Sequence, residues 1–268
     1  MSRIRAGELD VHVQRLTPEV PLDGDAPIVV CVHGLLTDSL ASYYFTLGPA
    51  FAERGLDVLM YDLRGHGRTT RPESGYRLEA FIDDLVTVLD TLEITRPVHV
   101  IGNSFGGSVA FGLAAARPDR VASVIAIEAE PPTAEWKQRM DTGFAVAHDT
   151  LGRDGIYDQI KEDHGAHTAR LIKLGNRILR TTTIADDILS STTISTDLST
   201  LRCPVFAIYG DESGMAPQAQ YLHDHLADCR TVVLADQGHS VLVERTAETI
   251  ELIFEWVRDT SRLAAQVR

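Results

Sequence analysis

The chain has 268 residues, of which 44% are hydrophobic and 24% are charged, and its formal net charge at pH 7 is −13. This composition is typical of a globular domain and excludes a disordered or fibrous chain. Because the negative charge would repel nucleic-acid phosphates and anionic lipid headgroups, we expect a small-molecule substrate, with neither nucleic acid nor a membrane as a partner.

The N-terminal stretch MSRIRAGELDVHVQRL alternates polar and apolar residues without a continuous apolar segment. It therefore predicts a first strand rather than a signal peptide. The rest of the sequence contains no run of about 18 apolar residues, the length needed to cross a membrane. The cysteines are Cys31, Cys203 and Cys229, an odd number without a C-x-x-C spacing, which indicates reduced thiols. We expect a cytoplasmic protein, and the sequence does not determine its oligomeric state.

Short apolar runs rich in β-branched residues recur along the chain. They predict buried strands at 28–33, 56–62, 98–103, 121–128, 205–210 and 231–236. Amphipathic helical patterns lie between them, and the segment 78–94 is an example with one apolar stripe. This alternation predicts the α/β class, with a mostly parallel central sheet flanked by helices.

One interval breaks the alternation. About 75 residues between the strands at 121–128 and 205–210 have a helical pattern and no convincing strand. We expect a helical cap at 131–200, inserted between the two parts of the core at 1–130 and 201–268. Such a cap would cover the carboxyl ends of the strands, where open α/β sheets bind ligands.

The cap supplies apolar candidates for a substrate pocket. They are Trp136, Met140, Phe144 and Ile156, joined by Met215 from the second part of the core. At least half of the cap candidates are expected only to pack the cap helices.

The segment GNSFGG, residues 102–107, follows an apolar strand and opens a helical stretch. A serine at the tip of a sharp strand-to-helix turn needs very small neighbours two residues before and two after, and Gly102 and Gly106 are in those positions. Such a turn would project the Ser104 hydroxyl above the sheet. It would also direct the Phe105 N–H toward an oxyanion formed there.

A second oxyanion donor is expected from a different loop. The segment VHGLLTDS, 32–39, follows another apolar strand, so the Leu35 N–H is our candidate. We expect His33 to brace that loop. His66, in the glycine turn DLRGHGRT, is expected to be structural.

The base candidate is His239, because VLADQGHSVLVE places it between a strand and an amphipathic helix, on the same rim of the sheet as Ser104. The pairs His164/His167 and His223/His225 have no third ligand nearby in a ligand-like pattern. We therefore expect no metal site.

Four segments occur in the order that is typical of one large family: HGL (33–35), DLRGHGRT (62–69), GNSFGG (102–107) and QGHS (237–240). On these motifs the whole chain resembles the α/β-hydrolase superfamily. The resemblance implies the α/β-hydrolase fold and a catalytic serine, acid and histidine in that chain order.

The position of the acid departs from the common pattern of that family. The acid usually sits three residues after the glycine that ends the penultimate strand, and here that residue is Ser213. One subgroup of the haloalkane dehalogenases instead has a glutamate after the strand that precedes the cap, and the segment 119–136 resembles that branch. Glu128 falls at the position of that glutamate and is our first choice. The alternatives are Asp211, Glu130, Glu212 and no acid at all.

The resemblance implies a serine hydrolase that cleaves small or medium esters, thioesters or lactones through an acyl-enzyme on Ser104, without a cofactor. Dehalogenation and the usual epoxide hydrolysis are disfavoured, because the nucleophile of those enzymes is an aspartate. One alternative is a carbon–carbon bond hydrolase of a diketone-type substrate, which GNSFGG also resembles, although its members keep the acid at the position of Ser213. The other is a non-catalytic small-molecule receptor of the same fold.

Overall fold

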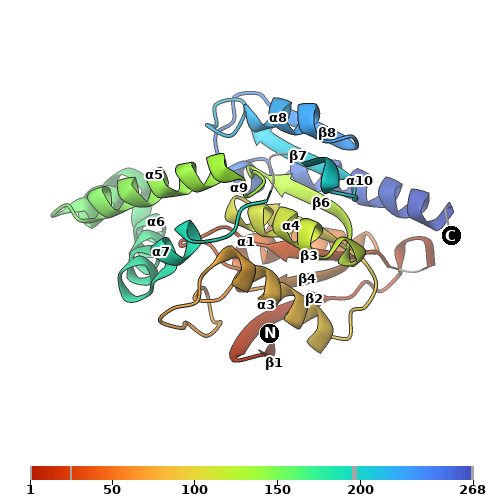
Figure 1. Cartoon of the computed structure of the whole chain (residues 1–268), viewed down its shortest axis with the longest axis horizontal. Coiled ribbons are helices and arrows are strands. Elements are labelled where there is room, and N and C mark those ends of the chain that lie inside the picture. The colour runs from red at the N-terminus through yellow and green to blue at the C-terminus, as the bar shows by residue number, and fades with distance from the viewer. Residues whose placement is uncertain (1, 25, 195–197, 267–268) are drawn as a thin grey trace.

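The computed structural model of the chain describes residues 2–24, 26–194 and 198–266, and within them the strands form a single eight-stranded sheet (Figure 1). The strands are β1 (Ser2–Ala6), β2 (Leu9–Leu16), β3 (Ile28–Val32), β4 (Asp57–Tyr61), β5 (Val98–Asn103), β6 (Val121–Ile127), β7 (Val205–Gly210) and β8 (Cys229–Leu234). Their order in the sheet is β1-β2-β4-β3-β5-β6-β7-β8. The pairs β1–β2 and β2–β4 are antiparallel. The remaining pairs, from β4–β3 to β7–β8 along the sheet, are parallel.

The six predicted core strands are confirmed, and the N-terminal prediction is corrected. The alternating stretch at the start of the chain is two strands rather than one, with Ala6 paired directly to Leu9. Gly7 makes this tight hairpin with a φ of +58°, a conformation that glycine adopts without steric cost. The polar and apolar alternation is present in both strands, so it did not reveal the turn between them.

The helices cover both faces of the sheet. They are α1 (Ala41–Tyr44), α2 (Leu47–Glu53), α3 (Leu78–Thr91), α4 (Phe105–Ala116), α5 (Ala134–Leu151), α6 (Ile156–Thr181), α7 (Ile184–Leu189), α8 (Gln218–His225), α9 (Val241–Glu244) and α10 (Thr246–Gln266). Short 3-10 turns lie at Leu22–Gly24, Pro118–Arg120 and Leu198–Thr200. Among these described helices, none combines the length and the apolar character needed to span a bilayer.

Two hydrophobic clusters lie on opposite faces of the sheet. Within β3, Val30 belongs to the cluster under α3 and α4, whereas Val29 and Cys31 belong to the cluster under α2 and α10. Every residue of β3 is buried, because successive side chains of a strand point to opposite faces and helices cover both. This double cover confirms the α/β class and explains why the core strands are almost continuously apolar in sequence.

Helices α5, α6 and α7 occupy the chain between β6 and β7, and α5 and α6 extend away from the sheet (Figure 1). They fall within the predicted cap at 131–200, whose limits stay a prediction. Helix α7 is attached to the core, because Asp187 accepts hydrogen bonds from the Gly75 and Tyr76 N–H groups at 2.8 and 2.9 Å. The Leu78 N–H donates to Ser191 Oγ at 2.8 Å close by.

Candidate active site

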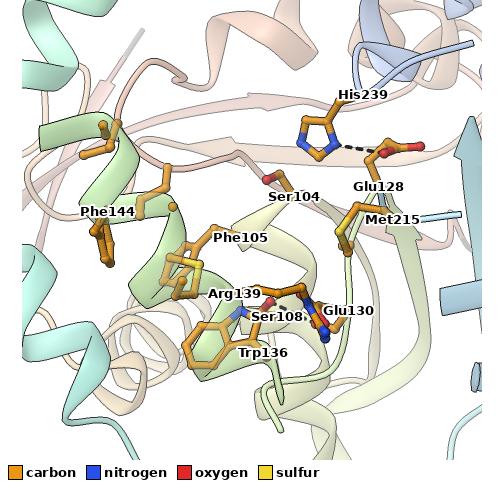
Figure 2. A pocket seen from close by; sticks show the side chains of 16 residues that line it. Ser104, Phe105, Ser108, Glu128, Glu130, Trp136, Arg139, Phe144, Met215 and His239 are labelled. Atoms are coloured by element: carbon orange, nitrogen blue, oxygen red, sulfur yellow. Dashed lines mark hydrogen bonds and ion pairs between the residues drawn. The ribbon is translucent and has the colours of Figure 1, made fainter. Parts of the chain in front are cut away.

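The turn between β5 and α4 holds Ser104 in a strained conformation. Its φ is 52° and its ψ is −122°, a region that non-glycine residues rarely adopt. The Ser104 N–H donates to the Ile127 carbonyl of β6 at 2.9 Å, and its own carbonyl accepts from the Gly107 N–H at 2.9 Å. These bonds hold the serine at the carboxyl end of the sheet with its hydroxyl directed into a pocket (Figure 2).

The glycines around the serine are required by close backbone contacts. A Cβ on Gly102 would overlap the main chain of Gly106, and a Cβ on Gly106 would overlap the carbonyl of Val32. Strand β5, helix α4 and strand β3 therefore approach one another as the sequence pattern predicted.

Glu128 and His239 are hydrogen-bonded to each other, although 111 residues separate them. His239 Nδ1 lies 2.8 Å from Glu128 Oε2, and Figure 2 shows the imidazole ring between this carboxylate and the Ser104 hydroxyl. The Glu128 side chain is 0% exposed and the His239 side chain is 54% exposed. The acid is thus withdrawn from solvent while the ring stays open to the pocket.

Within the described residues, no hydrogen bond joins Ser104 to His239. A nucleophile and its base commonly come within hydrogen-bond distance only when substrate is bound, so the apo arrangement is compatible with a proton transfer between them.

Ser213 contacts the Glu128 carboxylate, a contact that sequence analysis missed. Its hydroxyl donates to Glu128 Oε2, the same oxygen that faces His239, and it accepts from the Met215 N–H at 3.1 Å. The Gly210 N–H donates to the other carboxylate oxygen of Glu128. Ser213 and Gly210 together therefore fix the orientation of the Glu128 carboxylate. The signal in the sequence was a small hydroxyl residue at a position where an acid is the rule.

The other acid candidates lie elsewhere. Asp211 is exposed and accepts the Gln237 N–H at 3.3 Å, so it caps the turn before His239 without facing the ring. Glu212 is exposed as well. Glu130 is buried in the pocket wall and pairs with Arg139, whose Nε donates to Glu130 Oε1 at 2.7 Å. Among the carboxylates considered in the sequence, the structure brings Glu128 to the histidine.

Two histidines brace the loop that carries Leu35. His33 Nδ1 donates to the Gly34 carbonyl at 2.7 Å, and its Nε2 accepts from the Leu63 N–H at 3.0 Å. His66 Nδ1 donates to the Arg64 carbonyl at 2.8 Å, and its Nε2 accepts from the Leu36 N–H at 2.8 Å. These partners fix one neutral tautomer of each ring.

Two N–H groups beside Ser104, that of Leu35 in the braced loop and that of Phe105 at the start of α4, differ from their neighbours in their hydrogen bonding. In the part of the chain that the structure describes, the N–H groups of Leu35 and Phe105 make no hydrogen bond. Both residues line the pocket together with Ser104.

The buried ring of His66 predicts a specific acid sensitivity. Burial, followed by the neighbouring His33, lowers the pKa of His66 from 6.5 to about 3. Between these two values the unfolded chain binds more protons at this residue than the folded chain, so its stabilising contribution is present above pH 6.5 and is lost as the pH falls toward 3.

We therefore expect the free energy of unfolding of the wild type, minus that of His66→Gln, to decrease by about 1.4 kcal/mol per pH unit between pH 6 and 4.5. Urea denaturation of both proteins across this range measures the difference. If the difference in free energy of unfolding between the two proteins stays constant with pH, the pKa of His66 is not lowered by folding.

The pocket has a volume of about 440 Å³ and a largely apolar wall. It is lined by four of the five predicted pocket residues, Trp136, Met140, Phe144 and Met215. Trp136 also stacks on Phe105, with ring centroids 6.4 Å apart. Ile156 is not among the lining residues, because it begins α6 beyond the far end of α5.

The described residues contain no group of three or more histidine, cysteine, aspartate or glutamate side chains arranged to hold a metal ion. The exposed His164 and His167 lie on α6 without a third partner for such a site.

Comparison with known proteins places this geometry in a family. The model of the alpha/beta hydrolase fold family matches residues 27–246, a region that contains Ser104, Glu128 and His239. The chain belongs to the α/β-hydrolase fold family. The resemblance inferred from the four sequence motifs is thereby confirmed.

Individual relatives of this α/β-hydrolase carry different names. Epoxide hydrolase B of Mycobacterium tuberculosis is 36% identical over 163 residues, which cover 53% of this chain and 45% of the relative. The bifunctional esterase/perhydrolase DCH of Acinetobacter calcoaceticus is 34% identical over 110 residues, which cover 40% and 38%. The chain thus spans less than half the length of these curated relatives.

Solved structures extend the similarity along the chain. The enol-lactonase from Burkholderia xenovorans LB400 superimposes with a TM-score of 0.72 at 22% identity, covering 96% of this α/β-hydrolase and 99% of that chain. At this identity the likeness shows a shared fold.

Proposed function

We propose that this α/β-hydrolase is a serine hydrolase that cleaves a small or medium carboxylic ester, thioester or lactone through an acyl-enzyme on Ser104. The observation that carries the proposal is the 2.8 Å hydrogen bond between His239 Nδ1 and the fully buried Glu128 carboxylate, beside a serine held at a positive φ. The buried acid fixes the tautomer in which Nε2 is free to accept the proton of a nucleophile.

Each step of the proposed reaction is performed by a residue of the site. His239 Nε2 takes the proton from Ser104 Oγ as the oxygen attacks the carbonyl carbon, and the N–H groups of Leu35 and Phe105 stabilise the oxyanion that forms. His239 then gives its proton to the leaving alcohol or thiol, and the acyl-enzyme remains on Ser104. Water, activated by the same imidazole, cleaves the acyl-enzyme. The half-exposed His239 ring is accessible to that water.

The chemistry of a serine nucleophile favours acyl substrates over epoxides. If Ser104 attacked the saturated carbon of an epoxide, the product would be an ether, and no residue of the proposed site could help water to cleave it. Attack on a carbonyl carbon instead gives an ester that the same histidine can hydrolyse. The name of the epoxide hydrolase relative therefore does not set the substrate class proposed here.

A fluorophosphonate probe combined with an ester assay tests the proposal. Ser104 Oγ would form a bond to phosphorus as fluoride leaves, and His239 would take the serine proton. We expect peptide mass spectrometry to locate the adduct on Ser104 and p-nitrophenyl butyrate turnover to fall in proportion to labelling. Absence of both labelling and turnover in protein that is folded by circular dichroism would contradict the proposal and favour a receptor.

A further inference from the structure

One side of the pocket ends in an ion pair. Figure 2 shows Glu130 and Arg139 together, close to Ser108, on the opposite side of Ser104 from His239. Glu130 follows β6 in the chain, and Arg139 comes from α5. Arg139 Nε donates to Glu130 Oε1 at 2.7 Å, and Arg139 Nη2 pairs with Glu130 Oε2. The guanidinium therefore meets the carboxylate through one hydrogen bond and one further ion-pair contact.

The two partners of this pair differ in exposure. The Glu130 side chain is 7% exposed, and a carboxylate buried to this extent requires a cation to offset its desolvation. The Arg139 side chain is 44% exposed and lines the same cavity as Ser104. Arg139 thus neutralises Glu130 while part of its guanidinium remains accessible.

Apart from Ser104 and His239, the other polar side chains of the pocket wall already have partners within the described residues. The Ser108 hydroxyl donates to the main-chain carbonyl of Glu130 at 2.9 Å, and the Glu128 carboxylate is used by His239, Ser213 and Gly210. By contrast, Arg139 Nη1 donates to no group in the described part of the chain. A guanidinium has five N–H donors, so Arg139 retains donors for a ligand.

We propose that Arg139, held by Glu130, forms a subsite for a hydrogen-bond-accepting oxygen at the far end of the acyl chain of the substrate. The oxygen belongs to a carboxylate or to an amide carbonyl, because the pair has no net charge and Nη1 can donate to either. A plain alkyl chain of the same length would leave this donor unpaired in the pocket, which is the basis for discrimination. This inference rests on the proposed serine hydrolase function.

Three p-nitrophenyl esters separate these possibilities. Mono-p-nitrophenyl glutarate ends in a carboxylate, p-nitrophenyl 4-acetamidobutyrate carries an amide, and p-nitrophenyl pentanoate is the alkyl reference. For the wild type we expect kcat/KM for at least one oxygen-bearing ester to exceed that for the pentanoate by about tenfold or more. We expect that preference to vanish in Arg139→Met/Glu130→Gln, which removes both charges. Arg153→Met, which removes another arginine near α5, is the matched control and should keep it.

The single variant Glu130→Gln distinguishes the two oxygen sources. It leaves Arg139 with a net positive charge in the pocket, so the glutarate should gain relative to the amide ester if the site accepts carboxylates. If the ratio of kcat/KM for the glutarate to that for the amide ester is unchanged in Glu130→Gln, and the wild type prefers the amide ester, the oxygen bound by Arg139 is an amide carbonyl. If the double variant does not fold, Arg139→Lys replaces it. Lysine keeps the positive charge but lacks the planar set of guanidinium N–H donors, so the preference for the oxygen-bearing ester should fall several-fold.

The outcome is separable from that of the proposed function. Equal kcat/KM values for the three esters in the wild type, or a preference that survives in the double variant, would overturn the subsite while leaving the Ser104 chemistry intact. If no ester is turned over and the fluorophosphonate does not label Ser104, the serine hydrolase proposal fails, and the subsite is tested by binding. In that case free glutarate or 4-acetamidobutyrate should raise the melting temperature of the wild type more than pentanoate does, and the double variant should show no such difference. Equal shifts would overturn the subsite.

Discussion

Replacing Ser104 with alanine is expected to lower kcat for p-nitrophenyl butyrate by about 10⁶-fold, with KM little changed. The reason is that the hydroxyl is the proposed nucleophile, so its removal leaves no group on which the acyl-enzyme could form. The remaining rate should come from the oxyanion donors and from binding alone. Steady-state kinetics with protein of verified fold measure the effect.

The matched control is Ser74→Ala, an exposed serine in the loop before α3 that does not line the pocket. It should retain wild-type turnover. A Ser104→Ala protein with more than about a hundredth of the wild-type kcat would contradict nucleophilic catalysis by this residue.

Replacing Glu128 with glutamine is expected to lower kcat by about 10³ to 10⁴-fold. The amide has the shape of the carboxylate but no charge, so it stabilises neither the required tautomer nor the imidazolium that forms during the reaction. Asp211→Asn is the control, because Asp211 caps a turn near His239 without touching the ring, and we expect it to change kcat by less than threefold. Losses of similar, small size in both variants would contradict the assignment of the acid.

The hydrogen bond from Ser213 to Glu128 extends this prediction. Ser213 already contacts the carboxylate oxygen that faces His239, so an aspartate at position 213 has a path to the same Nδ1–H. We expect Glu128→Gln/Ser213→Asp to recover at least about tenfold of the kcat lost in Glu128→Gln. The same kinetic assay measures this recovery, and a double variant no more active than Glu128→Gln would show that the carboxylate at 213 does not reach the ring.

Much of the fold could be predicted from the sequence because the core strands are buried on both faces. Their continuous apolar runs, such as β5 and β7, were located with the same residues that the structure assigns. The N-terminal hairpin was not predicted, because Gly7 interrupts an alternation that continues on either side of it. Local patterns thus identified strands better than the turns between them.

The serine turn was predictable because its constraints are local. Gly102 and Gly106 lie within two residues of Ser104, and each avoids a backbone overlap that any side chain would create. The role of Ser213 was not predictable from local sequence, because it depends on Glu128, a residue 85 positions earlier in the chain. The Arg139 subsite was missed for a related reason. An arginine on a helix is usually solvated, and only the burial of Glu130 makes it part of the pocket wall.

The chain segment between β6 and α5 has a consequence for protein engineering. Glu128, which contacts His239, and Glu130, which contacts Arg139, are separated by the single residue Ala129, and α5 begins at Ala134. A chimaera that exchanges α5–α7 with those of a relative would therefore place a foreign helix against the native Glu130. Joining the parts after Pro132 preserves the acid but leaves Glu130 without its arginine, so a successful graft must bring a cation at the position of Arg139 or replace Glu130 at the same time.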